Sequence, residues 1–378
     1  MLKENKFHSF NQGNMPKGCQ FCVKGEKLVL FVTGVCPRKC YFCPVSDEKY
    51  GKDVIFANEQ RSFTSEDVIK EAEKMQAKGV GITGGDPLAK LDRTTRFIKK
   101  LKEHFGKDFH AHLYTSLRLV NDDNLQKLYM SGLDEIRFHP DLDSDSFWKR
   151  IDLATKFPWE VGIEAPLIPG KEKEFKQLID FIQDKVMFLN LNELEVADNS
   201  QSKLLEMGFK TKDQFSYAIE GSLELGLSLI KYIKEKGYHL KVHLCTAKLK
   251  DSVQLAERIK REAQGTKKVF DLVDNEGLLT RGALYLEELK PGVGYRESLK
   301  QDQKESIQKL NKILLEVKEN LQLKDEDLFL DTCKPRILLS KKHVKLNKKK
   351  LISLGLVPAI VTEYPTADQL EMEVEFLT

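Results

Sequence analysis

The sequence predicts an α/β fold in which a parallel sheet closes, completely or partly, into a barrel, with a small α/β appendage at the C-terminal end. Two observations support this prediction. Apolar runs with the composition of buried strands alternate with segments whose apolar residues have helical spacing. The intervening helices are about ten to fifteen residues long, which is typical of repeated β-α units with a parallel sheet. Six or more such units favour a barrel, with its chemistry at the carboxyl ends of the strands.

The expected barrel strands lie at residues 28–32, 80–83, 109–114, 135–139, 160–165, 186–191 and 240–244. The first helix is expected to start at Ser65, because the apolar residues of 68–75 fall on one helical face, and to end near Gly79. Further helices are expected around residues 97–101, at 121–130, from about 144, after each of the next two strands, and at 222–234.

The C-terminal part of the chain has a different order of elements. A charged amphipathic helix is expected at residues 298–321, a strand at 336–339, a lysine-rich helix at 341–350, and strands at 357–361 and 370–376. We therefore expect four parts: an N-terminal segment at 1–26, a barrel at 27–264, a connector with a helix at 265–323, and a small α/β unit at 324–378.

Composition predicts a large cytoplasmic enzyme. The 378 residues suffice for one large domain with an appendage or for two domains. Hydrophobic residues make up 41%, no apolar run is long enough to span a membrane, and the first residues lack the apolar core of a signal peptide. A net charge of +3 does not indicate nucleic-acid binding. Seven cysteines in this context favour a reducing compartment and metal binding over disulfides.

The most informative motif is a group of three cysteines, Cys36, Cys40 and Cys43, directly after the first expected strand. Three thiolates on one short loop can hold an iron–sulfur cluster. A cluster with four irons would keep one iron open for a substrate or cofactor, which indicates chemistry rather than electron storage. The alternative is a zinc knuckle, but structural zinc sites use four ligands, usually in two separated pairs.

The spacing C-x3-C-x2-C, with Phe42 directly before the last cysteine, resembles the motif of the radical S-adenosylmethionine (SAM) superfamily. The resemblance implies a six-unit partial barrel and a 4Fe–4S cluster held by Cys36, Cys40 and Cys43. It implies that the open iron chelates the amino and carboxylate groups of SAM. One electron from the cluster would then cleave the sulfonium and give a 5′-deoxyadenosyl radical that abstracts hydrogen. An electron donor such as ferredoxin or flavodoxin would be a partner.

A second motif, Thr83-Gly84-Gly85-Asp86-Pro87, ends the next expected strand. Two glycines allow the backbone to approach a ligand closely and leave its amide and carbonyl groups free to bond it. The segment resembles the Gly-Gly-Glu-Pro segment of the superfamily, which binds the methionyl amino group of SAM, although Asp86 replaces the usual glutamate. The alternative is an ordinary glycine turn before a helix, which the nearby cysteine loop makes the weaker interpretation.

Polar residues also stand at the ends of the later strands. The resemblance implies that the ends of the fourth to sixth strands contact the carboxylate, ribose and adenine of SAM. Arg137 could pair with the methionyl carboxylate, and Asn192 could bond the ribose hydroxyls. The alternative for both residues is that they are ordinary polar residues at strand ends and bind no ligand. The remaining candidates are Tyr114, Thr115, Ser116, His139, Glu164, Asn190, Glu193 and the turn at 168–170.

A second metal centre is a further hypothesis. Cys19 and Cys22 form a C-x2-C pair, which offers two thiolates but does not complete a site. Cys245 could be a third ligand, with Cys333 or His243 as the fourth, in an auxiliary iron–sulfur cluster or a zinc site. The alternative is that Cys245 and Cys333 are small buried apolar residues.

Residues 341–350 contain six lysines, which could bind RNA or phosphates. Because no aromatic residues are interleaved and no RNA-binding motif is present, the solvated face of a helix is the favoured interpretation.

The overall resemblance is to a mainly archaeal group related to pyruvate formate-lyase activating enzymes, and residues 27–58, 81–92, 134–140 and 243–261 carry it. It leaves three substrate classes open: a glycyl-radical protein partner, a tRNA base or a small metabolite. A non-enzymatic alternative is an iron–sulfur scaffold or redox-binding module without radical chemistry. The Gly-Gly-Asp-Pro segment argues against a scaffold, which would need no SAM site.

Overall fold

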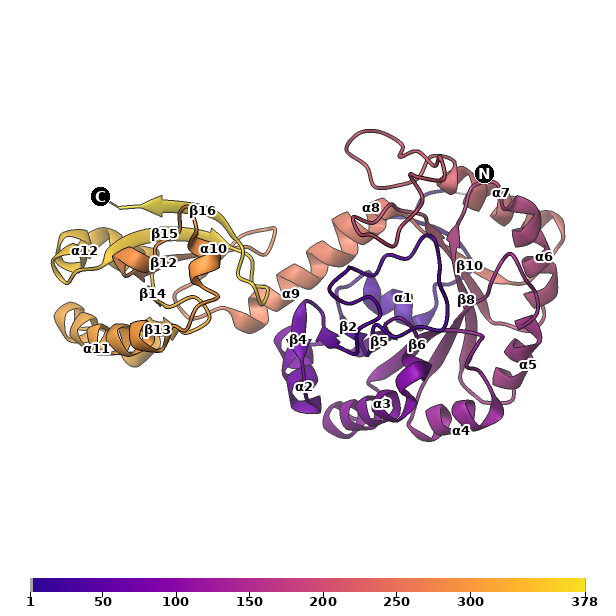
Figure 1. Ribbon diagram of the computed structural model, residues 1–378, viewed down its shortest axis with the longest axis horizontal. Helices are drawn as coiled ribbons and strands as arrows, with labels where there is room; N and C mark the ends of the chain where they lie inside the picture. The colour runs from indigo at the N-terminus through magenta and orange to yellow at the C-terminus, as the bar shows by residue number, and fades with distance from the viewer. Residues whose placement is uncertain (1–2, 378) are drawn as a thin grey trace. The chain divides into compact units, whose positions relative to one another are not determined.

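The computed structural model describes residues 3–377, and the chain divides into two compact units, Met1–Arg258 and Ile259–Thr378. Among these described residues, the first unit is built on a ten-stranded sheet in the order β1-β10-β9-β8-β7-β6-β5-β2-β3-β4 (Figure 1). Seven neighbouring strands are parallel: β2 (Lys27–Phe31), β5 (Gly79–Thr83), β6 (His110–Ser116), β7 (Glu135–His139), β8 (Glu160–Leu167), β9 (Phe188–Glu193) and β10 (Lys241–Cys245).

Antiparallel strands stand at both edges of this sheet. The strand β1 (Phe10–Gln12) pairs with β10, while β3 (Ile55–Ala57) and β4 (Gln60–Ser62) extend the sheet beyond β2. Since β1 and β4 are the two ends of the strand order, the sheet curls into an open barrel rather than a closed one. Six strand–helix units followed by a seventh strand confirm the predicted partial barrel.

Helices cover the outer face of the barrel: α2 (Ser65–Lys74), α3 (Leu91–Phe105), α4 (Asp122–Met130), α5 (Ile151–Ala154), α6 (Glu172–Ile182) and α7 (Ser222–Glu235). The start of α2 is fixed by a capping box, in which the Thr64 side chain accepts from the Asp67 amide and the Asp67 carboxylate accepts from the Thr64 amide. After β10 come α8 (Ala247–Leu249), a π-helical turn at Lys250–Leu255, and α9 (Ala256–Thr266).

Strand alternation divides the barrel residues into two sets. One set, with residues such as Leu30 and Ile82, points outward and packs under the helices in the main hydrophobic core. The set that points inward is largely polar or titratable and includes Lys27, His110, His112, Tyr114, Glu135, Arg137, Glu164, Asn190, Asn192 and His243. Barrel interiors are usually filled by branched apolar side chains. A polar interior therefore indicates a function for the inside of this barrel.

The short helix α1 (Lys17–Cys22) lies against this inner face at the amino ends of the strands. The Gly18 amide donates to the carboxylate of Glu135, the first residue of β7, at 3.2 Å. Gly18 is required by close packing, since a Cβ there would lie 2.6 Å from both Arg137 Nη2 and His112 Nδ1. The N-terminal segment is thus part of the barrel.

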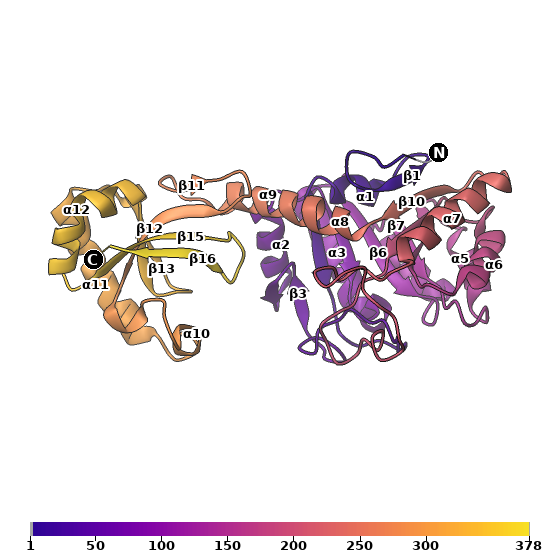
Figure 2. The same cartoon turned by 90° about the horizontal axis from the view of Figure 1, so that it is seen from above.

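The second unit holds a sheet in the order β13-β14-β12-β15-β16, with β11 (Leu272–Val273) paired to β12. Its strands are β12 (Leu279–Tyr285), β13 (Leu328–Asp331), β14 (Arg336–Leu339), β15 (Val357–Glu363) and β16 (Glu371–Phe376). The helices α11 (Lys304–Leu321) and α12 (Lys341–Ser353) pack on one face of this sheet, as Figure 2 shows. Without β16, the order is that of a split β-α-β arrangement.

This arrangement differs from the expected division at residues 265–323 and 324–378. The segment expected as a connector supplies β12, which is the central strand and pairs with both β14 and β15. It also supplies α11, whose Leu310 and Val317 belong to the core of the unit. The second unit therefore begins near residue 259. Among residues 3–377, none of the helices has the length and apolar character needed to cross a membrane.

Candidate active site

A cavity of about 610 Å³ lies at the carboxyl ends of the parallel strands in the first unit. Residues from six consecutive strand ends contribute to its wall, as expected for a barrel enzyme. The wall includes Cys36, Cys40, Phe42, Cys43, Thr83, Gly84, Gly85, Tyr114, Thr115, Ser116, His139, Glu164, Asn192, Glu193 and Lys250. The structure thus brings the cysteine loop, the glycine segment and several of the predicted strand-end residues around one space.

The cysteine loop follows β2 and places all three thiols on this cavity. The Cys43 amide donates to the Cys40 carbonyl at 3.2 Å, and the Arg38 amide points at Cys36 Sγ at 3.4 Å. Burial raises the pKa of all three thiols, that of Cys40 to about 11. Without a metal the thiols are therefore held protonated, and a bound metal would favour their thiolate forms.

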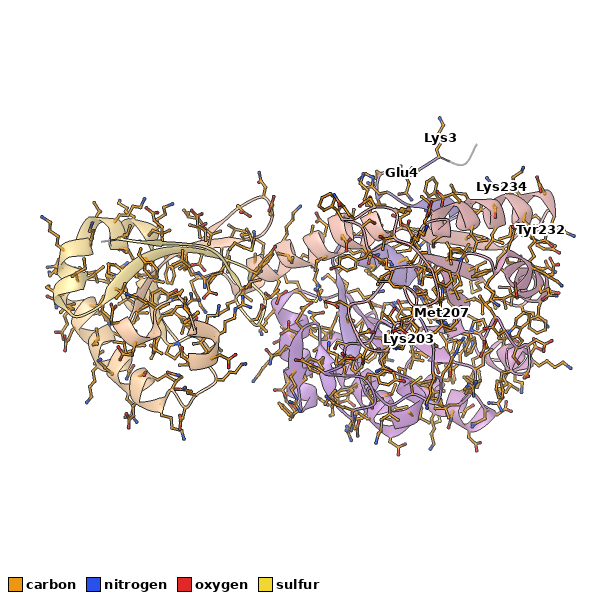
Figure 3. All side chains as sticks on the ribbon, turned by 45° about the horizontal axis from the view of Figure 1, so that its top comes forward. Lys3, Glu4, Lys203, Met207, Tyr232 and Lys234 are labelled. Atoms are coloured by element: carbon orange, nitrogen blue, oxygen red, sulfur yellow. The ribbon has the colours of Figure 1, made fainter. Side chains whose placement is uncertain are left out.

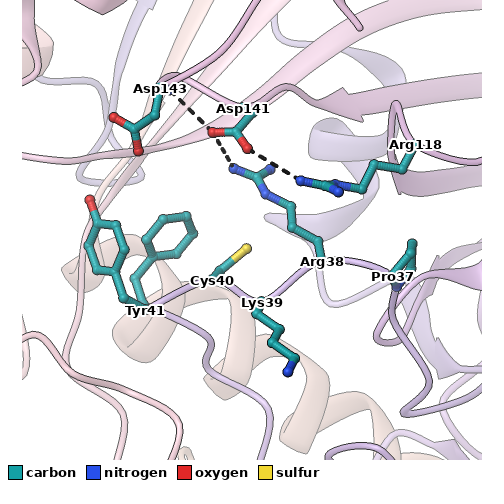
Figure 4. Close-up of a pocket in the computed structure, with 9 residues that line it drawn as sticks. Pro37, Arg38, Lys39, Cys40, Tyr41, Arg118, Asp141 and Asp143 are labelled. Carbon is teal, nitrogen blue, oxygen red and sulfur yellow. Dashed lines mark hydrogen bonds and ion pairs between the residues drawn. The ribbon is translucent and has the colours of Figure 1, made fainter. Parts of the chain in front are cut away.

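A second hollow of about 350 Å³ lies beside Cys40 (Figure 4). The Arg38 and Arg118 guanidinium groups approach the Asp141 carboxylate there at 3.5 and 3.9 Å. Arg38 also donates to the carbonyls of His139 and Pro140, at 2.9 and 3.3 Å. These contacts fix the cysteine loop to the end of β7. Phe42 contributes to the same attachment by stacking on the His139 ring, with centroids 5.8 Å apart.

The glycine segment is attached to the same loop by backbone hydrogen bonds. The Gly85 amide donates to the Thr33 carbonyl at 2.7 Å, and the Asp86 amide donates to the Val35 carbonyl at 2.9 Å. A Cβ on Gly85 would lie 2.6 Å from the Val35 oxygen, a backbone atom that cannot easily move aside. The two motifs therefore depend on each other's position.

Asp86 is part of this segment but lies away from the cavity. Its carboxylate is fully buried and accepts from the Leu88 amide at 3.0 Å and from the hydroxyls of Thr115 and Ser116, both at 2.7 Å. Burial raises the pKa of this carboxyl, although these hydrogen bonds oppose the shift. Asp86 thus fixes the glycine segment to the end of β6, and Pro87 begins a short 3-10 helix behind it. Neither side chain is among those on the cavity wall.

Arg137 also lies below the cavity rather than on its wall. Its side chain is 1% exposed and forms ion pairs with Glu135 and, at 3.0 Å, with Glu164. Glu164 reaches the cavity and accepts from Asn190 and Asn192 at 2.8 and 2.7 Å. Burial opposes the shift, but Arg137 and the two amides lower the pKa of Glu164, so that it is a carboxylate. Asn192 is on the wall as predicted, while Arg137 acts by holding Glu164.

Sequence reasoning missed Lys250 and Glu195 on the same wall. Lys250 begins the π-helical turn, forms an ion pair with Glu195, and donates to the Glu193 carbonyl at 3.2 Å. The Glu193 carboxylate accepts from the Ala247 amide at 2.7 Å and pairs with Lys212. Lys250 follows the last barrel strand by several residues, so only the three-dimensional course of the chain places it at the cavity. π-helical turns are frequent at functional sites.

The predicted second group of donors lies inside the barrel. Cys19 and Cys245 are buried, and Cys22 is half-buried on the same helix as Cys19. Asn190 Nδ2 contacts Cys19 Sγ at 3.2 Å, and the His243 imidazole is next to the same thiol. Cys333 is exposed and belongs to the second unit. The lysines of 341–350 lie on α12, whose Val344 and Leu351 face the core of the second unit.

As they stand, no three histidine, cysteine or acidic side chains of residues 3–377 are close enough to hold one metal ion, and this includes the loop thiols. The donor set nevertheless fits a 4Fe–4S cluster, because three thiols of one loop face one cavity of sufficient volume. The backbone of Gly84 and Gly85 and the polar atoms of Glu164 and Asn192 face the same space. Fold and site together define a barrel enzyme with a three-thiol loop at its active end.

Comparisons with known proteins identify the family. The radical SAM superfamily model matches residues 30–182. A protein of Methanocaldococcus jannaschii, named as a glycyl-radical enzyme activating enzyme, is 37% identical over 377 residues, covering 97% of this chain and 94% of the relative. The chain therefore belongs to the radical SAM superfamily.

Two solved structures are also similar to this chain. SuiB of Streptococcus suis bound to S-adenosylmethionine has 14% identity and a TM-score of 0.41, over 58% of this chain and 50% of that chain. This chain thus spans about half the length of SuiB. Coproporphyrinogen III oxidase (HemN) of Escherichia coli has 12% identity and a TM-score of 0.35, over 90% of this chain and 94% of that chain.

The protein is a radical SAM enzyme, and its family implies a 4Fe–4S cluster, SAM and an electron donor. The resemblance predicted from the cysteine loop and the glycine segment is confirmed. The scaffold alternative is not favoured, because both the family match and the M. jannaschii relative indicate radical chemistry.

Proposed function

We propose that Cys36, Cys40 and Cys43 hold the 4Fe–4S cluster, and that the large cavity binds SAM and directs its 5′ carbon at a glycine of a partner polypeptide. The observation that carries this proposal is that the three thiols and the backbone of Gly84 and Gly85 line the same cavity. A shared space is what the chemistry needs, because the cofactor has to contact both the open iron and the protein.

A bound cluster, reduced by an external donor, would supply one electron for cleavage of the C5′–S bond of SAM into methionine and a 5′-deoxyadenosyl radical, which would take a hydrogen atom from the substrate. The protein's part is to hold the substrate C–H next to the 5′ carbon and to exclude water. We propose that free backbone groups of the glycine segment bind the methionyl amino group. Asn192 and Glu164 present an amide and a carboxylate to the ribose hydroxyls, with Arg137 holding Glu164 in place.

Two observations favour a polypeptide substrate over a tRNA base or a small metabolite. The first is the name of the M. jannaschii relative, which covers 97% of this chain. The second is the segment after β9, which we call the rim loop (residues 194–221). Its Asn199 amide donates to the carbonyls of Cys43 and Val45, both at 3.0 Å, so the rim loop borders the cavity mouth.

The rim loop also presents apolar side chains to solvent. Leu205, Met207, Phe215 and Tyr217 are 59%, 54%, 87% and 62% exposed, and Figure 3 labels Met207 beside Lys203 on this loop. Several exposed apolar side chains on one loop beside a cavity are typical of a surface that receives another protein. A metabolite pocket would not need such a surface outside the cavity.

The cluster proposal is tested by anaerobic reconstitution followed by dithionite and SAM. The wild-type chain should bind iron at the loop and release 5′-deoxyadenosine. Cys43→Ala should lose cleavage, whereas Cys333→Ala, a change in the second unit, should retain it. An active Cys43→Ala variant would contradict the assignment of the loop.

The substrate proposal is tested with a glycyl-radical polypeptide whose glycines carry deuterium. Deuterium should appear in 5′-deoxyadenosine, and a glycyl radical should appear in the electron paramagnetic resonance spectrum. Phe215→Ser with Tyr217→Ser should raise the KM for the polypeptide while slow cleavage of SAM alone is unchanged. Met130→Ser is the matched control, because Met130 is 71% exposed at the end of α4 that points away from the cavity. SAM cleavage without deuterium transfer would refute a polypeptide substrate.

We further propose ferredoxin or flavodoxin as the electron donor and the cytoplasm as the location, since the cluster requires a low-potential donor and the cysteines a reducing compartment. We also propose a second metal centre at Cys19, Cys22 and Cys245. Its support is that Cys245 of β10 is buried on the same side of the sheet as Cys19 and Cys22 of α1, although it lies more than 200 residues further along the chain.

A further inference from the structure

The inside of the barrel below the large cavity contains a cluster of soft metal ligands. The helix α1 contributes Cys19 and Cys22, and the end of β10 contributes Cys245. The two elements pack together: Cys19 Sγ contacts Asn190, which is paired with His243 in the sheet, and Cys245 shares an apolar cluster with Val23, the residue after Cys22. None of the three lines either of the two cavities described above. These cysteines are therefore separate from the thiols of the loop.

A histidine completes this cluster. His243 is 1% exposed, points inward from β10 two residues before Cys245, and lies next to the Cys19 thiol. Its Nε2 contacts Ser9 Oγ at 3.4 Å, while its Nδ1 is a buried nitrogen without a hydrogen-bond partner. A proton on Nε2 donated to Ser9 leaves the Nδ1 lone pair free to bind a metal. Histidines that bind metals are usually fixed in this way by their other ring nitrogen.

Positive charge lies beside the cluster. The Arg137 guanidinium is close to Cys19, and its Nη2 is a buried nitrogen without a hydrogen-bond partner. The Lys27 ammonium is close to Cys22. Cations beside buried thiols suit the negative charge that cysteine ligands carry when they bind a metal. Cysteines that were only small buried apolar residues would not need a free imidazole nitrogen beside them.

We propose that Cys19, Cys22, Cys245 and His243 form a closed site for one Zn²⁺, which fixes α1 inside the barrel. This inference rests on the second metal centre proposed above and defines its ligands and its metal. Three cysteines and one histidine are a common donor set of structural zinc sites. Four such ligands complete the tetrahedral coordination of a single Zn²⁺ and leave no position open. Cys333 is left out because all four donors belong to the first unit.

The site would support the floor of the active cavity through a short chain of contacts. The Gly18 amide, next to Cys19, donates to Glu135 at 3.2 Å, and Glu135 pairs with Arg137. Arg137 in turn pairs at 3.0 Å with Glu164, which reaches the cavity. A metal that fixes α1 thus holds the base of the side chains that face SAM. Its role is positional, since none of the four ligands contacts the cavity.

The experiment separates this site from the loop cluster. In the full chain with Cys36→Ala, Cys40→Ala and Cys43→Ala, the loop cannot hold iron, so any metal that remains belongs to the second site. Elemental analysis of this variant should find about one zinc and no iron per chain. Replacement by Co²⁺ should give the intense near-ultraviolet absorption of thiolate ligands.

The ligand variants are made in the same background. Cys19→Ala and Cys22→Ala should each abolish the zinc, His243→Ala should weaken zinc binding, and His243→Cys should restore it. Cys333→Ala is the control and should keep one zinc. Folded protein with no metal, or zinc retained in Cys19→Ala, would overturn the proposal. About four irons per chain would also overturn it, because they would indicate an iron–sulfur cluster in place of zinc.

A measurement on the wild-type holoenzyme keeps the test valid if these variants do not fold. X-ray absorption at the zinc edge should give three sulfurs at about 2.3 Å and one nitrogen at about 2.0–2.1 Å. The absence of zinc from the wild-type chain would overturn the inference. Iron bound by the loop and SAM cleavage are read separately, so failure of the zinc site and failure of the proposed function are distinguishable.

Discussion

Two glutamates on the inner face of β8 should respond in opposite ways to the same substitution. Glu164 is fully used as an acceptor, since it receives hydrogen bonds from Arg137, Asn190 and Asn192 at 3.0, 2.8 and 2.7 Å. Glu160 lies four residues earlier on the same strand, and burial together with the Glu135 charge raises its pKa. Glu164→Gln should therefore destabilise the first unit, and Glu160→Gln should not.

The expected size follows from the contacts. A glutamine has one carbonyl oxygen in place of two carboxylate oxygens, so one donor of Glu164 must face an NH2 group, and buried Arg137 retains only Glu135 as an ionic partner. Breaking a buried ion pair costs about 3–5 kcal/mol, and the remaining partner reduces the loss to about 3 kcal/mol. This corresponds to a fall in Tm of about 6–12 °C for a unit of this size. Glu160→Gln should change stability by less than about 1 kcal/mol, in the stabilising direction.

The two variants should also differ in their pH dependence. The folded pKa of Glu164 is lowered from its usual value of 4.5, so its contribution is complete above pH 4.5 and is lost as pH falls through the folded pKa. The difference in the free energy of unfolding between Glu164→Gln and the wild type should therefore shrink below pH 4.5. The folded pKa of Glu160 is raised, so its carboxylate costs stability at neutral pH and the cost disappears as pH falls through that raised value.

Urea unfolding followed by circular dichroism, without SAM and with identical metal loading, measures these differences. The barrel histidines are present in all three proteins, so their contribution to the pH dependence of stability cancels when the variants are compared with the wild type. Equal stability of Glu164→Gln and the wild type at pH 7, or the same loss in both variants, would refute the argument.

Three further predictions follow from the close packing and burial in the first unit. Gly85→Ala places a Cβ 2.6 Å from the Val35 oxygen, so it should lower SAM binding in equilibrium dialysis several-fold; unchanged SAM affinity would argue against the shared position of the two motifs. Gly18→Ala should cost about 1–3 kcal/mol in urea unfolding, whereas the exposed Gln20→Ala on the same helix should be nearly neutral, and equal effects would contradict the tight fit of α1. Burial, then the Lys27 and Arg137 charges, keeps the pKa of His112 well below 6.5, so only the unfolded chain takes up this proton and stability should fall by about 1.4 kcal/mol per unit as pH drops below 6.5. In His112→Gln, the dependence of the free energy of unfolding on pH should correspond to about one proton fewer than in the wild type. An unchanged dependence would be evidence against a neutral His112.

Much of the barrel could be predicted from the sequence, because strands and helices of regular length alternate and the polar residues follow the period of a strand. The same periodicity places Arg137 and Glu164 on the inner face. It cannot tell which inward side chain reaches the cavity, since this depends on how the strands are staggered around the barrel. Arg137 was therefore predicted at the cavity although it lies beneath Glu164.

The boundary of the second unit was harder to predict from the sequence. The residues paired with its central strand, Leu279–Tyr285, lie 53 to 84 positions further along the chain in β14 and β15, and nothing local in the sequence shows that pairing. Lys250 was missed for a similar reason, since it approaches the cavity only through the course of the chain after β10.

The attachment of the rim loop to the cysteine loop has a consequence for communication between the enzyme and the polypeptide partner proposed above. Asn199 bonds the carbonyls of Cys43 and Val45, and the Lys203 amide donates to the Tyr41 carbonyl at 2.6 Å. If the cysteine loop tightens around a bound cluster, it would pull these carbonyls and shift the exposed apolar side chains of the rim loop. A partner could thus distinguish a loaded enzyme from an empty one. By thermodynamic reciprocity, the same partner would then help the enzyme to retain its metal.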